Sequence, residues 1–273
     1  AASGPLETSR SVRDLQPDEL DPSFVIGVID TGVTLELDAP HPFVAAHLAP
    51  GWQGAVDDVD PANPSDQDGH GTFVAGVIGS YARSAALAMY DALDRADPDR
   101  QDELVVAALA DLATVEHLQL VNLSFFGDAD AGAPIAIREA LRTLFTARPD
   151  LVVVAGAGNR WSDRPTWPAA FSRDFPGRLI AVGAADQTVH RPEHTLPPRA
   201  SFSNFGSWVR MAAPGQRITS SLPGGRYGTW SGTSMAAPLV AGTAALVREQ
   251  APALTPKQVV QRMVRATTPS CDQ

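Results

Sequence analysis

Three side chains in separate segments of the sequence are of the types that together activate a serine nucleophile. Asp30 ends the apolar run FVIGVID, His70 stands between two glycines in DGHGTF, and Ser234 opens the small-residue run SMAAPLVAG. A serine hydroxyl is a weak nucleophile until a histidine takes its proton and a carboxylate orients that histidine. The three segments therefore supply a candidate nucleophile, base and orienting acid.

The position of Ser234 favours such a role for its hydroxyl. The apolar run that follows predicts a buried helix over Ser234 to Gln250. Unpaired N–H groups and the positive dipole end at a helix N-terminus would stabilise an oxyanion formed beside the serine. Asn159 ends the apolar run LVVVAGAGN, and its side-chain amide could donate to the same oxyanion.

Each of these residues also has an ordinary structural interpretation. An aspartate or asparagine after a strand is commonly a turn or cap residue, and a serine at a helix start is commonly an N-cap. A single histidine is most often structural. The catalytic interpretation depends on finding all four side chains together in one chain.

The elements that must position these side chains alternate between strands and helices. Short runs rich in Val, Ile and Leu predict five strands buried on both faces. The runs are Phe24 to Ile29, Leu87 to Tyr90, Leu120 to Leu123, Leu151 to Val154 and Leu179 to Val182. Helical patterns over Gln101 to His117 and Pro134 to Arg148 connect successive strands. This βαβ order predicts a parallel sheet, which places functional sites at the carboxyl ends of its strands.

The C-terminal third of the chain has a different pattern. Short extended segments are predicted over Ser207 to Ala212 and over Ile218 to Leu222, and a Pro-Gly-Gly turn follows the second. These segments predict an excursion resembling a β-hairpin before the helix that begins at Ser234. A last helix is predicted over Pro256 to Ala266, with Thr255 as its N-cap and proline at its first position.

Composition excludes several classes of function. The net charge is −10, so nucleic acid and anionic membrane surfaces are not expected as partners. The chain has no run of 18 apolar residues and no secretory signal pattern at residue 1. Cys271 is the single cysteine, which excludes an internal disulfide and makes a cysteine nucleophile an unfavourable interpretation.

Taken together, the four segments resemble those of the subtilisin-type serine peptidases. The matching motifs are DTG at Asp30, GHGTFVAG around His70, AGAGN ending in Asn159 and GTSMAAPLVAG around Ser234. They occur in the order typical of that family, which differs from the Ser, Asp, His order of α/β-hydrolases. The resemblance covers residues 24–267, including the connecting segments IAVGA, RASFSNFG and MAAPG.

The resemblance implies an α/β three-layer sandwich, with a mainly parallel sheet of about seven strands between helices. It implies a serine endopeptidase in which Asp30, His70 and Ser234 form the catalytic triad, with Asn159 donating to the oxyanion and Thr233 supporting it. A protein or peptide substrate would bind extended, as an added strand. The residues implied to contact the substrate are Ser124, Phe125, Phe126, Gly127, Gly156, Ala157, Gly158 and Thr166. The resemblance also leads us to expect a cis bond between Trp167 and Pro168.

The chain departs from the family at several positions. Phe126 stands where members commonly have a glycine, so it would change the wall of the substrate pocket. A calcium-binding loop that many members carry after the histidine helix is expected to be missing, because the connection between Ile78 and Met89 is short. Aspartates between Asp57 and Asp68 could bind a structural calcium ion, or form an ordinary solvated acidic loop. No cofactor or metal is expected for catalysis.

We interpret residues 1–23 as an N-terminal extension and residues 24–273 as one catalytic domain. The inhibitory prodomain usual in the family is not expected within residues 1–23, which are too few to form one. Secretion is the usual fate of the family, so the resemblance implies an extracellular location.

Three rival functions share this fold. A sedolisin-like acid peptidase would have Glu in place of His70 and Asp in place of Asn159. A peptide macrocyclase would intercept the same acyl-enzyme with an amine and would need an insertion that excludes water. A catalytically inactive binding domain is the third alternative, and the four complete motifs argue against it.

Overall fold

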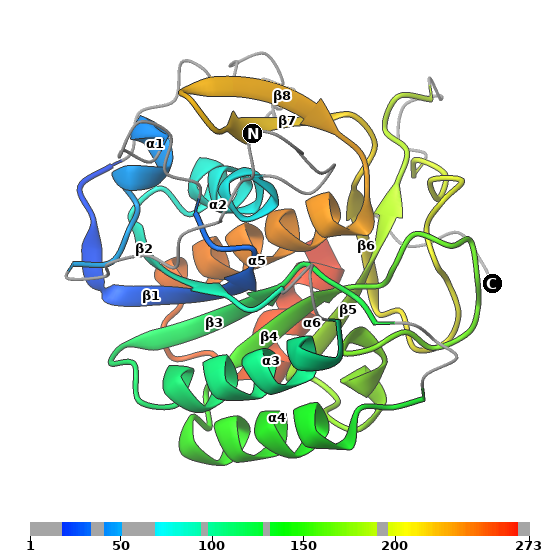
Figure 1. The fold of residues 1–273 in the computed structure, drawn as a ribbon, viewed down its shortest axis with the longest axis horizontal. Helices are drawn as coiled ribbons and strands as arrows, with labels where there is room; N and C mark the ends of the chain where they lie inside the picture. Colours follow the sequence, from blue (N-terminus) through cyan, green and yellow to red (C-terminus); the bar gives the residue numbers. More distant parts are fainter. Residues whose placement is uncertain are drawn as a thin grey trace.

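A computed structural model describes residues 18–33, 41–50, 69–93, 98–127, 132–189 and 196–266. Its centre is a six-stranded sheet in which every pair of neighbours is parallel, in the order β2-β1-β3-β4-β5-β6. The strands are β1 (Asp21–Asp30), β2 (Ala85–Asp91), β3 (Leu118–Leu123), β4 (Val152–Gly156), β5 (Leu179–Ala185) and β6 (Met211–Pro214). The carboxyl ends of these strands therefore meet at one edge of the sheet (Figure 1).

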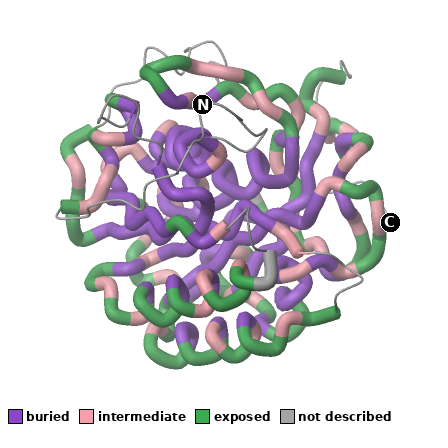
Figure 2. The backbone as a smooth tube through the Cα atoms, viewed as in Figure 1, coloured by how far each residue is buried: buried purple, intermediate pink, exposed green. Residues whose placement is uncertain are grey.

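Helices cover both faces of the sheet, which confirms the predicted three-layer sandwich (Figure 1). The helices α3 (Pro98–Leu112) and α4 (Ile135–Ala147) and the 3-10 helix η3 (Ala169–Arg173) contribute to one core cluster. The second cluster includes side chains from α1 (Pro42–Ala45), α2 (His70–Tyr81), α5 (Thr233–Gln250) and α6 (Pro256–Ala266). Figure 2 shows the buried sheet and helix α5 in the interior of the molecule.

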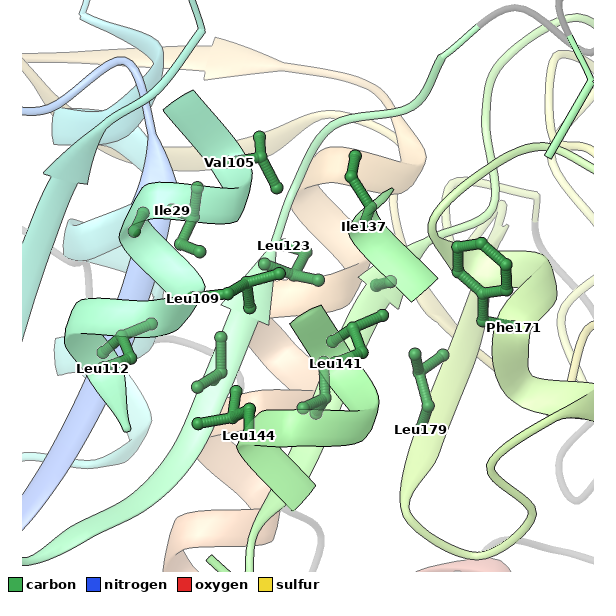
Figure 3. Close-up of a cluster of buried hydrophobic side chains, with 14 of the residues drawn as sticks. Ile29, Val105, Leu109, Leu112, Leu123, Ile137, Leu141, Leu144, Phe171 and Leu179 are labelled. Carbon is green, nitrogen blue, oxygen red and sulfur yellow. The ribbon is translucent and has the colours of Figure 1, made fainter. Parts of the chain in front are cut away.

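Alternation along each strand explains how one sheet serves two cores. In β1, Val25 and Ile29 belong to the cluster under α3 and α4, whereas Ile26 and Val28 belong to the cluster under α2 and α5. Successive side chains of a strand point to opposite faces, so a strand covered on both sides must be apolar throughout. Figure 3 shows the first cluster, where Leu109 and Leu141 reach from α3 and α4 towards Leu123 of the sheet.

The strand count corrects the expectation of about seven strands in the sheet. Within the described residues the sheet has six strands, and β7 (Ile218–Leu222) and β8 (Arg226–Trp230) form a separate antiparallel hairpin. The hairpin confirms the predicted excursion. It packs on α2 and α5, because Ile218, Leu222 and Trp230 contact a cluster formed by Phe73, Val77, Met235 and Leu239.

Helix α3 corrects a predicted boundary. A helix was expected over Gln101 to His117, but α3 begins at Pro98 and ends at Leu112. A turn follows, in which the Thr114 N–H and hydroxyl both donate to the Asp111 carbonyl. His117 then takes a φ of 58°, a left-handed conformation that a continuing α-helix does not allow.

Two further local predictions, the cap of α6 and the cis bond before Pro168, are confirmed. Helix α6 begins with the predicted cap, where Gln258 N–H donates to Thr255 Oγ1 at 3.4 Å and Thr255 N–H donates to Gln258 Oε1 at 2.9 Å. The bond between Trp167 and Pro168 is cis. Three residues, 82–84, connect α2 to β2.

The acidic segment from Asp57 to Asp68 lies outside the described residues. Among the helices that the structure describes, none is long and apolar enough to cross a membrane.

His47, which follows α1, is fully buried and carries a titratable ring into the interior. Its Nδ1 lies 2.8 Å from the Phe43 carbonyl, which can only accept, so Nδ1 carries the proton. The ring packs against helix α2, where a Cβ at Gly79 would lie 3.0 Å from it. Burial lowers the pKa of His47 below its ordinary value, because the charged imidazolium would lose its hydration.

We predict that acidification destabilises the protein partly through His47. The unfolded chain binds a proton at this histidine at about pH 6.5, whereas the folded protein binds that proton only at a lower pH, because its pKa is lower. Folding free energy is therefore lost as the pH falls through that window. Urea unfolding at pH 7.5 and pH 5.0 should show a smaller loss for His47→Gln than for wild type, both in an Ser234→Ala background that prevents self-cleavage. Equal losses would show that His47 does not contribute.

Candidate active site

The first part of the candidate site is a contact between the end of β1 and the start of α2. Asp30 is the last residue of β1 and is fully buried. Its Oδ1 accepts a hydrogen bond from the Thr31 N–H at 2.8 Å and lies 2.6 Å from Nδ1 of His70. A carboxylate in this position holds the proton of the imidazole on Nδ1, which leaves Nε2 as the atom able to accept a proton.

Glycine makes this contact sterically feasible. A Cβ at Gly71 would lie 2.0 Å from the Gly32 carbonyl oxygen, so the backbone of α2 rests directly on the turn after β1. The Gly71 N–H also donates to Thr31 Oγ1 at 3.0 Å. Gly69, at the N-cap of α2, has a φ of 77°, which a residue with a side chain adopts only with strain. The glycine that follows His70 therefore permits the close approach of one backbone to another.

Ser234 occupies the first turn of α5, and only 7% of its surface is exposed. Its carbonyl would normally accept from the N–H of residue 238, but Pro238 has no N–H. Ser124, just after β3, replaces the missing donor, because its hydroxyl donates to the Ser234 carbonyl at 3.0 Å. Asn122 Nδ2 in turn donates to Ser124 Oγ at 2.8 Å. Strand β3 therefore fixes the position of the candidate nucleophile.

Asn159 follows β4 and is hydrogen-bonded to Thr233, the residue before Ser234. Its Oδ1 accepts from both the N–H and the hydroxyl of Thr233, at 2.9 and 3.0 Å. The Gly158 N–H donates to Thr233 Oγ1 at 2.9 Å, so two neighbouring residues bind the same threonine. With Oδ1 occupied in this way, Nδ2 of Asn159 is the end of the amide that can donate to another group.

The two segments expected to flank a substrate are held by further hydrogen bonds. Thr166 is buried, and its hydroxyl donates to the Ala157 carbonyl at 2.6 Å. Asn204 Nδ2 donates to the same carbonyl at 2.9 Å. On the other side, the Gly127 N–H donates to the carbonyl of Trp167 at 2.8 Å. These bonds link residues 124–127, 156–158 and 166–167 into one region.

Phe125 and Phe126 differ in their surroundings. Phe125 is buried in the core cluster under α3 and α4, so its side chain faces away from Ser234 and only its backbone remains available to a substrate. Phe126 is half-buried. Gly156 leaves space for the helix start, since a Cβ there would lie 3.3 Å from the Thr233 carbonyl oxygen.

Sequence reasoning missed several residues of this region. The ring of Trp230, at the end of β8, lies 6.2 Å from that of His70 at an interplanar angle of 21°, and 4.7 Å from that of Phe73 at 9°. Asn122 and Asn204 were also missed, and no local signal distinguishes them from other asparagines. Pro238 could have been noticed, because a proline inside a helical pattern removes one hydrogen bond.

A polar cavity of about 530 Å³ lies away from this region, near the start of β3. His117, Gln119, Arg148 and Arg248 are among the residues that line it. Their contacts have a structural role: Arg148 donates to the carbonyls of Ala113 and Val115, and Arg248 to the Asp150 carbonyl. In the described parts of the chain, no three His, Cys, Asp or Glu side chains gather closely enough to hold a metal ion.

Comparison with known proteins identifies the family. The model of the subtilase family, a group of peptidases, matches residues 21–273. The chain belongs to the subtilase family. A thermophilic serine proteinase of Bacillus sp. (strain AK1) is 34% identical over 235 residues, covering 82% of this chain and 52% of that protein. Subtilisin NAT of Bacillus subtilis subsp. natto is 32% identical, covering 89% and 60%. This subtilase thus spans between half and two thirds of the length of these relatives.

Solved structures agree with the observed fold. A cold adapted subtilisin-like serine proteinase superposes with a TM-score of 0.69 at 27% identity, covering 93% of this chain and 86% of that one. The prenylagaramide maturation protease PagA has a TM-score of 0.68 at 23% identity, covering 92% and 85%, which shows likeness of fold. In this subtilase, β1 lies between β2 and β3, where chain order reverses, and such switch points are where open α/β sheets place their sites.

We predict that Ser124 and Pro238 are energetically coupled. Removing the Ser124 hydroxyl strands a buried carbonyl, at a cost of about 1 to 3 kcal/mol in the free energy of unfolding. In a Pro238→Ala background, the new N–H can bond to the Ser234 carbonyl, so Ser124→Ala should become nearly neutral.

Urea unfolding of the double-mutant cycle in an Ser234→Ala background measures this coupling. Ser172→Ala is the matched control, because the buried Ser172 hydroxyl donates to the Trp208 carbonyl at 2.7 Å, away from α5. The cost of the control should be independent of Pro238. A Ser124→Ala cost that is the same in both backgrounds would disprove the replacement of the donor.

Proposed function

We propose that this subtilase is a serine endopeptidase that cleaves peptide bonds through an acyl-enzyme on Ser234. The observation that carries the proposal is the 2.6 Å contact between His70 Nδ1 and the fully buried Asp30. A buried carboxylate bound to Nδ1 orients the imidazole and stabilises its protonated form during the reaction. That arrangement favours general-base catalysis and gives a simple packing role for His70 little support.

In the proposed mechanism, Nε2 of His70 takes the hydroxyl proton of Ser234 as the oxygen attacks the scissile carbonyl carbon. The tetrahedral intermediate collapses when His70 returns the proton to the leaving amine, so the C–N bond breaks and the acyl-enzyme remains. Water then attacks the ester, with His70 again accepting and returning a proton. Asp30 stays ionised throughout and stabilises the imidazolium.

Two donors are proposed for the oxyanion. The Ser234 N–H lies in the first turn of α5, where backbone donors have no partner within the helix. Asn159 Nδ2 is the second donor, supported by the two bonds from Thr233 that occupy its Oδ1. Thr233 is thus a positioning residue in this proposal.

The substrate is proposed to lie extended between residues 124–127 and 156–158, with Thr166 below the second segment. An extended peptide gains affinity from main-chain hydrogen bonds and specificity from the pockets beside it. An inhibitory prodomain as partner, a structural calcium ion bound between Asp57 and Asp68, and an extracellular location stay predictions.

Among the rival functions, His70 and Asn159 argue against the acid peptidase. A macrocyclase would share the acyl-enzyme, and no described contact favours an amine over water as its acceptor. An inactive binding domain would have no need to orient the amide of Asn159. Here the two hydrogen bonds from Thr233 to Oδ1 orient the amide so that Nδ2 can donate to another group.

The decisive experiment is labelling with a fluorophosphonate, which reacts with activated serines. We expect one modified residue, Ser234, identified by mass spectrometry of the digested protein. The His70→Ala variant should label far more slowly, because the base is removed, while Ser172→Ala should label like wild type. Modification at another serine, or labelling that does not depend on His70, would contradict the proposal.

Phe126 is proposed to narrow the pocket for the side chain that precedes the scissile bond. Ser124 reaches towards α5 and Phe125 is buried on the opposite face, so alternation along the extended chain returns Phe126 to the side of Ser234. A ring in this position would leave room for small or medium apolar side chains. The described residues on the opposite wall, 156–158, carry no charge that would pair with Lys or Arg.

We predict that Phe126→Gly increases kcat/KM for peptides with Phe before the scissile bond by at least about tenfold, because each misfitted methylene costs about 1 to 3 kcal/mol. Peptides that differ only at this position provide the measurement, normalised to the Ala peptide in each variant. An unchanged Phe to Ala ratio would mean that the ring points away from the pocket, and a wild-type preference for Arg would refute the pocket assignment.

A further inference from the structure

Beside the candidate active site, the surface carries aromatic and basic side chains that the proposed mechanism does not use. We define the aromatic–basic surface as Arg160, Trp161, Arg164, Arg199 and Phe205. Trp161 is 62% exposed, which is unusual for a residue of its size. It stands two positions after Asn159, so at most about 7 Å of extended backbone separates the two residues. The surface is therefore adjacent to the proposed oxyanion site.

The backbone under this surface is held in a conformation that needs support. Trp161 has a φ of 47°, a left-handed conformation that is rare for a bulky residue and persists only where the surroundings impose it. Three hydrogen bonds impose it here. The Trp161 N–H donates to the Phe202 carbonyl at 2.8 Å. Asn204 Oδ1 accepts from the N–H groups of Arg160 and Ser162 at 3.0 and 3.1 Å.

Arg199 links the two aromatic rings of the surface. Its guanidinium carbon lies 4.3 Å from the Phe205 ring centre and 5.8 Å from that of Trp161. Nη1 donates to the Ser203 carbonyl at 2.7 Å, and this is the one side-chain hydrogen bond that Arg199 makes within the described residues. A guanidinium fixed in this way keeps Nε and Nη2 for a carboxylate and loses little entropy on binding it.

The charge of this region is opposite to that of the whole chain. Residues 159–174 and 196–210 contain five arginines and two aspartates, a net charge of +3 in a chain of net charge −10. Hydrogen bonds join the two segments: Phe205 N–H donates to the Ser162 carbonyl at 3.0 Å, and Trp208 Nε1 donates to the Asp163 carbonyl at 3.0 Å. Both segments lie on the β5 and β6 side of the molecule (Figure 1).

We propose that the aromatic–basic surface binds an acidic segment of the substrate next to the scissile bond, so that the enzyme prefers acidic protein substrates. The inference rests on the proposed peptidase function and specifies its substrate class. Carboxylates of the substrate pair with Arg199, while Trp161 contacts the apolar stems of the same segment. An acidic enzyme repels acidic substrates over most of its surface, so a local positive region orients them towards the site.

The test compares three peptides with one neutral cleavage sequence, flanked by three Glu, three Gln or three Lys residues on either side of the scissile bond. At low salt we expect kcat/KM for the Glu peptide to exceed that of the Gln peptide by about tenfold, since each exposed charge pair contributes only modestly. The ratio should fall towards one in 0.5 M NaCl, which screens exposed charges. Glu and Gln peptides cleaved equally at low salt would overturn the proposal.

Three variants localise the effect. Arg199→Glu should abolish or reverse the Glu to Gln ratio, and Trp161→Gly should reduce it while permitting the positive φ. The matched control is Arg142→Glu, an exposed arginine on α4 that lies outside residues 159–174 and 196–210, which should keep the wild-type ratio. A control that lowers the ratio as much as Arg199→Glu would assign the preference to overall charge and overturn the proposal.

A binding measurement separates this inference from the peptidase function. Fluorescence anisotropy of labelled Glu and Gln peptides with the Ser234→Ala variant needs no cleavage. Salt-sensitive binding of the Glu peptide that is lost in Arg199→Glu supports the surface even if no peptide is cleaved, in which case the peptidase proposal alone fails. Cleavage of peptides without tighter binding of the Glu peptide would mean that the surface proposal alone fails.

Discussion

The contact between two glycine backbones is the constraint on which the candidate site depends. Gly71 touches the carbonyl of Gly32, so the N-terminus of α2 lies directly on the turn that leaves β1. Any side chain at position 71 would push the helix away and separate His70 from Asp30. Because Asp30 is fully buried, that separation would also leave a carboxylate in the interior without the imidazole beside it. The contact between His70 and Asp30 and the packing of α2 on the end of β1 therefore depend on each other.

Helix α5 makes the second half of the site depend on the sheet as well. Pro238 removes a hydrogen bond from the first turn, and Ser124 from the β3 end supplies the replacement. Thr233 is bound from the β4 end by Asn159 and Gly158. The ends of two neighbouring strands therefore fix the start of α5, and a third strand end supplies Asp30. Parallel strands are the architecture that brings three such ends to one edge.

The sequence predicted the sheet strands and the candidate catalytic residues better than the contacts between distant segments and the ends of helices. Strands buried on both faces must be apolar throughout, so five of the six sheet strands stood out as short apolar runs, whereas β6, with the sequence MAAP, has no such pattern. The candidate residues at Asp30, His70, Asn159 and Ser234 could be chosen by type, because the chemistry requires those groups. The bond between Ser124 and the Ser234 carbonyl joins residues 110 positions apart, and no local pattern encodes that distance. The end of α3 depended on the left-handed conformation of His117, which its residue type does not predict.

The way α5 is held has a consequence for the order in which the molecule assembles. Its first turn is bound by partners 110 and 74 positions earlier in the chain, so these contacts have high contact order and form late. Units such as β3-α4-β4 involve shorter separations and can pair first. Until α5 docks, one face of the sheet lacks its main cover, Ser234 lacks its bond to Ser124, and Thr233 lacks its bonds to Asn159. We therefore expect a folding intermediate that exposes apolar surface, with the proposed catalytic groups assembled only when α5 docks.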